Sequence, residues 1–179
     1  MTFIVKMVLA ITMGLTLVSG TGCAPTKVWL SKPAIQSAGN AYYETSFEPL
    51  KRNDRYFAAF RLTVANKTGK PMEIDWNKTL YLFNGNPNGV FVFRGIKPED
   101  IKNGTVPPDL IPARGRFSRE ISPYKLIARS QISSRTLDAG EIKAGMLPKG
   151  NNGVHLVVRQ EGNDIVEKIF LQIEEKEVR

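Results

Sequence analysis

Large apolar residues recur at alternate positions along much of this chain, most clearly from residue 56 to residue 65. One set of alternate positions is apolar throughout: Tyr56, Ala58, Phe60, Leu62 and Val64. The intervening set is Phe57, Ala59, Arg61, Thr63 and Ala65, which contains the two polar residues of the segment. Because alternate side chains of a strand point to opposite faces, this segment is predicted to be a strand with one face in a core.

A second alternating segment follows the sequence NKTGKP at residues 66–71. Apolar Met72, Ile74 and Trp76 alternate there with two acidic residues. Gly and Pro in the intervening segment favour a reversal of the chain. We therefore expect the second strand to return antiparallel to the first.

Two further hairpins are predicted where apolar runs flank segments rich in Asn and Gly, residues that tolerate positive φ. The first joins residues 79–83 to 90–93 through a turn at 84–89, and the second joins 154–158 to 165–173 through a turn at 160–164. Short strands near residues 42–47 and 117–121 bring the expected total to about seven or eight.

Helical signals are few and short. Residues 97–103 have Pro98 at a first helical position and predict a single helical turn. Residues 122–130 are long enough for two turns. Many short strands separated by turns favour an all-β fold, an antiparallel β-sandwich of immunoglobulin-like architecture. The chain has one cysteine, so the cysteine pair of antibody domains is absent and the description concerns architecture only.

The N-terminus has the pattern of a secretory signal peptide. Residues 3–18 are almost entirely apolar, with Lys6 as their single charge, and small residues follow at 19–22. This apolar stretch is shorter than the roughly 20 residues that a membrane-spanning helix needs. We therefore expect residues 1–22 to be a cleaved leader.

The small residues end directly on Cys23, the single cysteine of the chain. The sequence Gly20, Thr21, Gly22, Cys23 resembles the lipobox of bacterial lipoproteins, with glycine at the place of the usual leucine. The resemblance covers about the first 25 residues. It implies that Cys23 carries acyl chains such as palmitate after cleavage, and that Ala24 directs the protein to the outer membrane, facing the periplasm. Several acyl chains together give lasting attachment to a bilayer.

Residues 23–40 are predicted to be the lipidated N-terminus and a flexible tether, because neither a helical nor a strand period persists in them. A flexible chain of this length would hold the domain roughly 20 to 25 Å from the bilayer. Residues 41–179 are then expected to form the β-sandwich domain.

Candidate catalytic chemistry is sparse. The sole histidine, His155, is predicted to face outward, and one His with one Cys excludes a zinc site built from several nitrogen or sulfur ligands. Glu73 and Asp75 lie two positions apart on one strand face and could act as a hydrolytic carboxylate pair, although acids on a solvent-facing strand also serve solubility. No catalytic residue, metal or cofactor is therefore assigned.

The chain carries a formal net charge of +8, and one segment concentrates basic residues. Between residues 114 and 135 there are six bases and one acid. The bases form a candidate anion-binding patch: Arg114, Arg116, Arg119, Lys125, Arg129 and Arg135. For a membrane-tethered chain the nearest anions are lipid head groups and peptidoglycan, whereas nucleic acid is not expected because the segment has few aromatic residues for base stacking. A solvated face without a partner remains the alternative.

Three hypotheses follow for function. The first is a non-catalytic envelope lipoprotein that binds or scaffolds another envelope component, including an envelope protein. The second is a lipoprotein that binds or senses a small ligand or a glycan in a pocket. The third is a hydrolase using carboxylates. The long Pro-rich segment at residues 95–123 is the expected partner surface, because long connections in compact domains are often functional.

Overall fold

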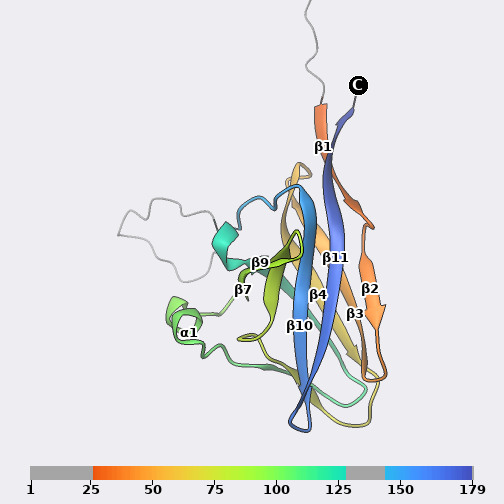
Figure 1. The fold of residues 1–179 in the computed structure, drawn as a ribbon, viewed down its shortest axis with the longest axis vertical. Coiled ribbons are helices and arrows are strands. Elements are labelled where there is room, and N and C mark those ends of the chain that lie inside the picture. Colours follow the sequence, from red (N-terminus) through yellow and green to blue (C-terminus); the bar gives the residue numbers. More distant parts are fainter. Residues whose placement is uncertain (1–25, 128–143, 179) are drawn as a thin grey trace, which may run out of the picture.

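The computed structural model describes residues 26–127 and 144–178, which form antiparallel β-structure almost throughout (Figure 1). Eleven strands lie within this part of the chain: β1 (Thr26–Lys32), β2 (Gln36–Gly39), β3 (Tyr43–Arg52), β4 (Tyr56–Asn66), β5 (Met72–Ile74), β6 (Leu80–Phe83), β7 (Asn86–Val92), β8 (Asp109–Ile111), β9 (Arg116–Pro123), β10 (Gly150–Gln160) and β11 (Asn163–Val178). The helical segments are α1 (Pro98–Asn103) and a 3-10 turn, η1 (Tyr124–Leu126).

The strands form one curled sheet in the order β1-β11-β10-β6-β7-β9-β4-β3-β2, and outside this order β5 pairs with β10 and β8 pairs with β5. One layer contains β10 and β11, and the opposite layer contains β2, β3, β4 and β9. The layers are continuous through β7, which pairs with β6 and, at Phe91 and Val92, with β9. The expected all-β antiparallel sandwich is confirmed, but eleven strands replace the seven or eight predicted, because β1, β2 and β8 carried no recognisable alternation.

Alternation predicted the buried face of β4 correctly from Phe60 to Val64, whereas Phe57 and Ala59, predicted on the other face, are buried as well. Phe60, Leu62 and Val64 of β4 are wholly buried, whereas Arg61 between them is exposed. Both predicted hairpins are present, as β6 with β7 and β10 with β11. The first turns at Asn84 and Gly85, both with positive φ, as its Asn- and Gly-rich sequence required.

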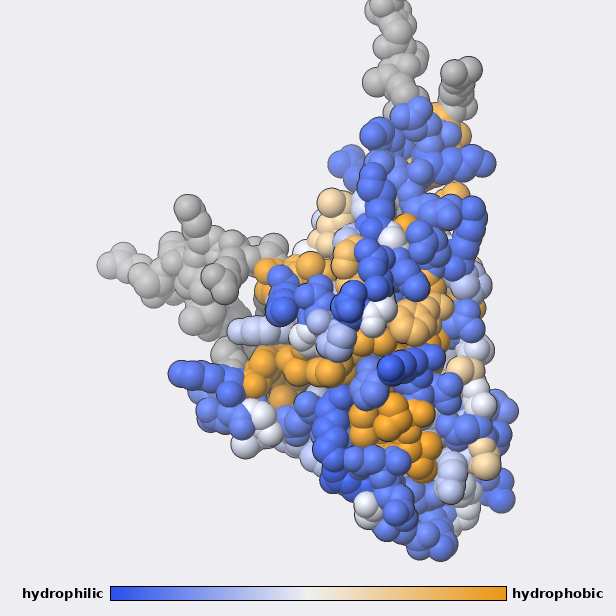
Figure 2. All heavy atoms as spheres, viewed as in Figure 1, coloured by the Kyte–Doolittle hydropathy of each residue, from blue (hydrophilic) through white to orange (hydrophobic). Residues whose placement is uncertain are grey.

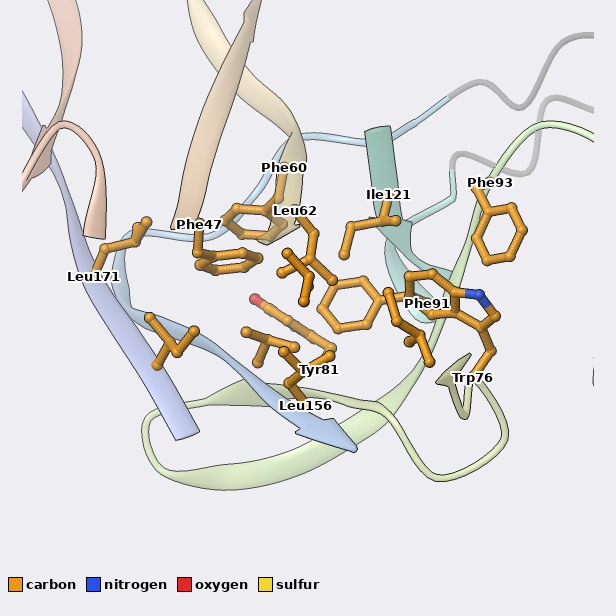
Figure 3. Close-up of a cluster of buried hydrophobic side chains, with 14 of the residues drawn as sticks. Phe47, Phe60, Leu62, Trp76, Tyr81, Phe91, Phe93, Ile121, Leu156 and Leu171 are labelled. Carbon is orange, nitrogen blue, oxygen red and sulfur yellow. The ribbon is translucent and has the colours of Figure 1, made fainter. Parts of the chain in front are cut away.

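Aromatic side chains from both layers meet in the core (Figure 3). Phe47 of β3 stacks on Phe60 of β4 with ring centroids 4.2 Å apart, and Tyr81 and Phe91 approach Phe60 from the facing side at 6.3 and 6.4 Å. Such offset and edge-on aromatic pairs stabilise a core by more than the burial of their apolar area alone.

The surface of the molecule is uneven in polarity. Hydrophilic residues cover the two ends of the molecule in Figure 2, and apolar residues gather at mid-height.

The expected pairing of the second alternating segment with the first is wrong. β5 pairs with β10 and β8 and lies in the layer opposite β4. β4 already has β3 on one side and β9 on the other, so neither of its edges is available. The intervening turn instead carries the chain across to β10, where the Gln160 amide donates hydrogen bonds to Thr68 Oγ1 at 2.7 Å and to the Lys70 carbonyl at 3.0 Å.

The expected tether is also wrong over residues 26–39. β1 pairs along its whole length with β11, from Thr26 opposite Val178 to Lys32 opposite Gln172, and β2 pairs with β3. Trp29 is only 9 % exposed and belongs to the core. The two strands are short and rich in polar residues, and long-range pairing rather than local pattern holds them. The β-domain therefore begins by Thr26 instead of residue 41. The predicted leader and Cys23 lie outside the described residues.

The predicted helical turn at residues 97–103 is confirmed as α1. Pro98 occupies its first turn and Gly104, with φ of 65°, ends it in the left-handed conformation. The second predicted helix is shorter than expected, since residues 124–126 form a single 3-10 turn and residues 128–130 lie outside the described part of the chain.

Candidate functional site

Four small hydroxyl side chains form one row across the outer face of the layer made by β2, β3, β4 and β9. The strand registers place them directly opposite one another: Ser37, Ser46, Thr63 and Ser118. Thr63 Oγ1 and Ser118 Oγ lie 3.2 Å apart, within hydrogen-bond distance. Because neighbouring strands are about 4.8 Å apart, this row extends for about 14 Å across the sheet.

Charged side chains border the hydroxyl row on both sides. The neighbouring row on one side contains Gly39, Glu44, Ala65 and Arg116. The row on the other side contains Glu48, Arg61 and Glu120, and Arg61 Nη1 donates to Glu48 Oε2 at 3.3 Å. The hydroxyl row is therefore a low strip between taller charged groups.

A hollow of about 410 Å³ lies over this strip and the row containing Glu44 and Arg116. Ala65 lies between the two charged groups and Gly39 lies on the other side of Glu44, and both have little side-chain bulk, which lowers the surface beside Glu44. We call this hollow the hydroxyl groove and define it by the residues that line it and carry its chemistry: Ser37, Glu44, Ser46, Thr63, Ala65 and Arg116.

The hydroxyl groove offers complementary hydrogen-bonding groups in a small area. Each hydroxyl can donate and accept, the Glu44 carboxylate only accepts, and the Arg116 guanidinium donates in a planar fork that suits carboxylates. Such a surface can bind an extended ligand rich in hydroxyl, amide and carboxylate groups.

Sequence reasoning missed the hydroxyl groove although it placed Arg61 and Thr63 correctly on the outer face of their strand. Hydroxyl residues on four strands form a row only when the registers of three strand pairs are known. The available signal was the small or hydroxyl residue at an outward position of each strand, which by itself is typical of any solvent-facing sheet.

The structure does not bring the predicted basic patch together. Arg116 and Arg119 lie on opposite faces of β9, since Arg116 is exposed and Arg119 faces the interior. Arg114 occupies the turn before β9 with φ of 58°, and Lys125 Nζ lies 3.4 Å from Asn88 Oδ1 beside η1. Arg129 and Arg135 lie outside the described residues. Of the described bases in this set, Arg116 alone lines the hydroxyl groove.

Arg119 has a structural role. Its Nη2 donates to Asp109 Oδ1 at 2.8 Å, and its guanidinium lies 4.2 Å from the centroid of the Phe93 ring. Asp109 also accepts a hydrogen bond from Trp76 Nε1 at 2.7 Å. This arrangement joins β8 and β9 to the Trp76 end of the core, within the long segment at residues 95–123 that was expected to be a partner surface.

The candidate carboxylate pair is bound by an arginine. Arg159 of β10 donates from Nη1 to Glu73 Oε1 at 3.2 Å and from Nη2 to Asp75 Oδ2 at 2.8 Å. Asp75 lies after the end of β5, and its Oδ1 accepts the backbone N–H groups of Asn77 and Lys78. The two acids therefore fix β5 and the following turn to β10 and do not face a ligand as a free pair.

A third carboxylate, Asp164, completes this cluster. Its Oδ2 lies 2.5 Å from Lys78 Nζ and its Oδ1 lies 3.1 Å from Arg159 Nε. The hydrogen bond from Lys78, followed by that from Arg159, lowers the pKa of the Asp164 carboxyl. Conversely, the hydrogen bond to Asp164 is the main reason that the pKa of Arg159 is raised. The cluster is therefore a charge network in which two cations, Lys78 and Arg159, bind three carboxylates.

His155 lies half-buried on the outer face of β10, opposite Leu80 of β6 and Lys168 of β11. Within residues 26–127 and 144–178, no three His, Cys, Asp or Glu side chains are placed to hold a metal ion. No helix in this same part of the chain is long and apolar enough to cross a bilayer.

Comparison of the chain with models of protein families, with curated proteins and with solved structures finds no match in any of the three.

Proposed function

We propose that this protein is a non-catalytic, lipid-anchored protein of the bacterial cell envelope that binds an extended envelope glycan in its hydroxyl groove. The observation that carries the proposal is the row of Ser37, Ser46 and Thr63 beside Glu44 and Arg116. The ligand class follows from the chemistry of this surface.

A glycan strand matches the hydroxyl groove in shape and in hydrogen bonding. Sugar hydroxyls exchange hydrogen bonds readily with Ser and Thr hydroxyls, and the row runs in a straight line across the strands. Peptidoglycan adds carboxylates on its stem peptides, which suit the exposed guanidinium of Arg116. We therefore choose peptidoglycan as the ligand to test.

The anchor is proposed from the lipobox-like residues that end at Cys23. Two residues, Ala24 and Pro25, separate Cys23 from the start of β1 at Thr26. Three Cα-to-Cα steps reach at most about 11 Å. The start of the β-domain would therefore lie within about 11 Å of an acylated Cys23, closer to the bilayer than the flexible tether of residues 23–40 would have held it.

Binding is favoured over hydrolysis by the position of the candidate acids. Glu73 and Asp75 both accept hydrogen bonds from Arg159 and so fix β5 to β10, whereas a glycosidase needs two carboxyl groups that flank its substrate.

Co-sedimentation with purified peptidoglycan sacculi tests the binding proposal. Wild-type protein is expected to pellet with sacculi, and Ser46→Tyr is expected to remain in the supernatant because the new ring fills the hydroxyl groove. Lys168→Tyr, at an exposed position of β11, is the matched control and should pellet like the wild type. Equal pelleting of both variants would contradict the proposal.

The anchor is tested separately by the intact mass of the mature protein purified from bacterial membranes. Acyl chains on an N-terminal Cys23 are expected, and Cys23→Ser should release the protein into the soluble fraction. A mature wild-type chain with an unmodified Cys23 would contradict the anchor.

A further inference from the structure

The β1–β11 strand pair extends beyond the sandwich as a two-stranded ribbon. Pairing between β10 and β11 ends at Gly150 opposite Ile173, whereas β1 continues to pair with β11 as far as Val178. Residues 174–178 therefore pair with β1 alone, over about 16 Å at about 3.3 Å per residue. Figure 1 shows this ribbon rising above the other strands, with the C-terminus beside the start of β1.

The two faces of the ribbon differ. Trp29, opposite Glu175, packs into the core and is 9 % exposed. The other face presents Val28, Leu30 and Val178, of which Leu30 is 36 % and Val178 is 45 % exposed. These three aliphatic side chains are neighbours on the ribbon, because Val28 precedes Leu30 by two positions and Val178 lies opposite Thr26. We call them the ribbon patch.

We infer that the ribbon patch rests in the interface of the bilayer to which the protein is anchored. This inference rests on the proposed acylation of Cys23. The short chain between Cys23 and β1 identifies the bilayer as the surface that the ribbon patch contacts. Because Cys23 precedes Thr26 by only three residues, an acylated Cys23 would hold the ribbon tip within about 11 Å of its own membrane insertion point. Exposed aliphatic groups held that close to a bilayer gain free energy by leaving water.

Charges on the ribbon do not oppose this contact. Lys32 Nζ lies 2.6 Å from Glu174 Oε2 on the face of the ribbon patch, and Lys27 and Lys149 both pair with Glu175 on the other face, at 3.7 and 2.8 Å. Lys176, opposite Val28, has a long aliphatic stem that lets its ammonium group reach the head groups. The paired charges predict that contact does not require anionic lipid.

Tryptophan placed in the ribbon patch reports the contact directly. The full chain is expressed with its leader, purified from membranes as the acylated protein and reconstituted into phosphatidylcholine vesicles whose acyl chains are brominated, because bromine quenches nearby indole fluorescence. Leu30→Trp is the test variant, and Val166→Trp, 50 % exposed in the part of β11 that pairs with β10, is the matched control. The wild-type chain gives the background from Trp29 and Trp76. An aromatic residue is well accommodated at a strand position, so both variants retain the fold.

The inference predicts that brominated lipid quenches the emission of Leu30→Trp and shifts it to shorter wavelength, with or without added phosphatidylglycerol, while Val166→Trp stays at background. An acylated protein in which position 30 is not quenched overturns the ribbon contact and leaves the anchor intact. Quenching at both positions overturns the inference that the ribbon, and not the rest of the β-domain, contacts the bilayer. A concentration-dependent blue shift of Leu30→Trp without vesicles identifies a second copy of the chain as the occupant and also overturns the inference. An unacylated Cys23, measured by mass on the same sample, overturns both the anchor and the ribbon contact.

Discussion

The ring of Phe170 lies over Gly153, its direct partner in the β10–β11 register. A Cβ atom at position 153 would lie 2.5 Å from Phe170 Cδ1 and 2.6 Å from the carbonyl oxygen of Ile169. Because one of these obstacles is backbone, a side chain cannot be accommodated by a simple rotation of the ring. Gly153 thus allows an aromatic side chain to cover the outer face of β10.

Gly153→Ala is expected to lower the free energy of unfolding by about 3 kcal/mol, as overpacking does in tightly packed regions. Gly69→Ala is the control, since a Cβ there meets no heavy atom within 4 Å, and it should change stability by less than about 0.5 kcal/mol. Urea unfolding of both variants measures the difference. Similar effects at the two positions would contradict the close approach of Phe170.

Two buried tyrosine hydroxyls should respond differently to removal. Tyr81 Oη donates to Asn152 Oδ1 at 2.5 Å, and Asn152 cannot turn away because its amide donates to the carbonyls of Pro148 and Gly150. Tyr81→Phe would leave a buried acceptor without a donor and should cost about 1 to 3 kcal/mol. The Tyr43 hydroxyl has no hydrogen-bond partner among the described residues, so Tyr43→Phe should be neutral or stabilising in the same unfolding experiment. Equal losses for the two variants would show that the pairing of Tyr81 is unimportant.

Burial of Tyr43 predicts a loss of stability at alkaline pH. Desolvation raises the pKa of its hydroxyl from an ordinary value of 10.0 to about 12. The folded state therefore holds this proton more tightly than the unfolded state does, and the resulting stability is complete below pH 10 and is lost as the pH rises toward about 12. Melting temperatures measured across this window should fall in the wild type and fall less in Tyr43→Phe. Parallel profiles for the two proteins would be the contrary result.

The pairing of β1 with β11 predicts that the N-terminal strands stabilise the domain. Trp29→Ala should cost about 3 to 5 kcal/mol, because it empties a large buried site. Leu30→Ala, at the adjacent exposed position, should cost less than about 1 kcal/mol. Thermal unfolding distinguishes the two. A flexible tether at residues 23–40 would make both variants indistinguishable from the wild type.

Local pattern was sufficient to predict the central strands of this fold. At Phe60, Leu62 and Val64 the period of two is unbroken, and burial of one face is the main requirement on the sequence. The same pattern could not predict β1 and β2, where Trp29 is the one buried aromatic side chain and pairing partners lie far away in the chain. Nor could it predict the partner of β5, which depends on both edges of β4 being occupied.

The candidate site shows the same division between local and long-range information. The outward direction of Thr63 follows from alternation, but its neighbours Ser46 and Ser118 are 17 and 55 positions away and are set by register. The basic residues were grouped because they are close in sequence. This grouping fails in β9, where Arg116 and Arg119 are three positions apart and therefore lie on opposite faces of the strand. Sequence spacing therefore predicts the face of a strand and cannot by itself predict a surface.

Binding in the hydroxyl groove is tested most directly by the site at which a soluble peptidoglycan fragment contacts the protein. Backbone chemical-shift changes in NMR spectra of the isotope-labelled chain measure this site. The largest changes are expected at Ser46, Thr63 and Arg116, and Ser46→Tyr should abolish them. Absence of changes at saturating fragment, or changes centred on the charge network of Arg159, would contradict binding in the hydroxyl groove.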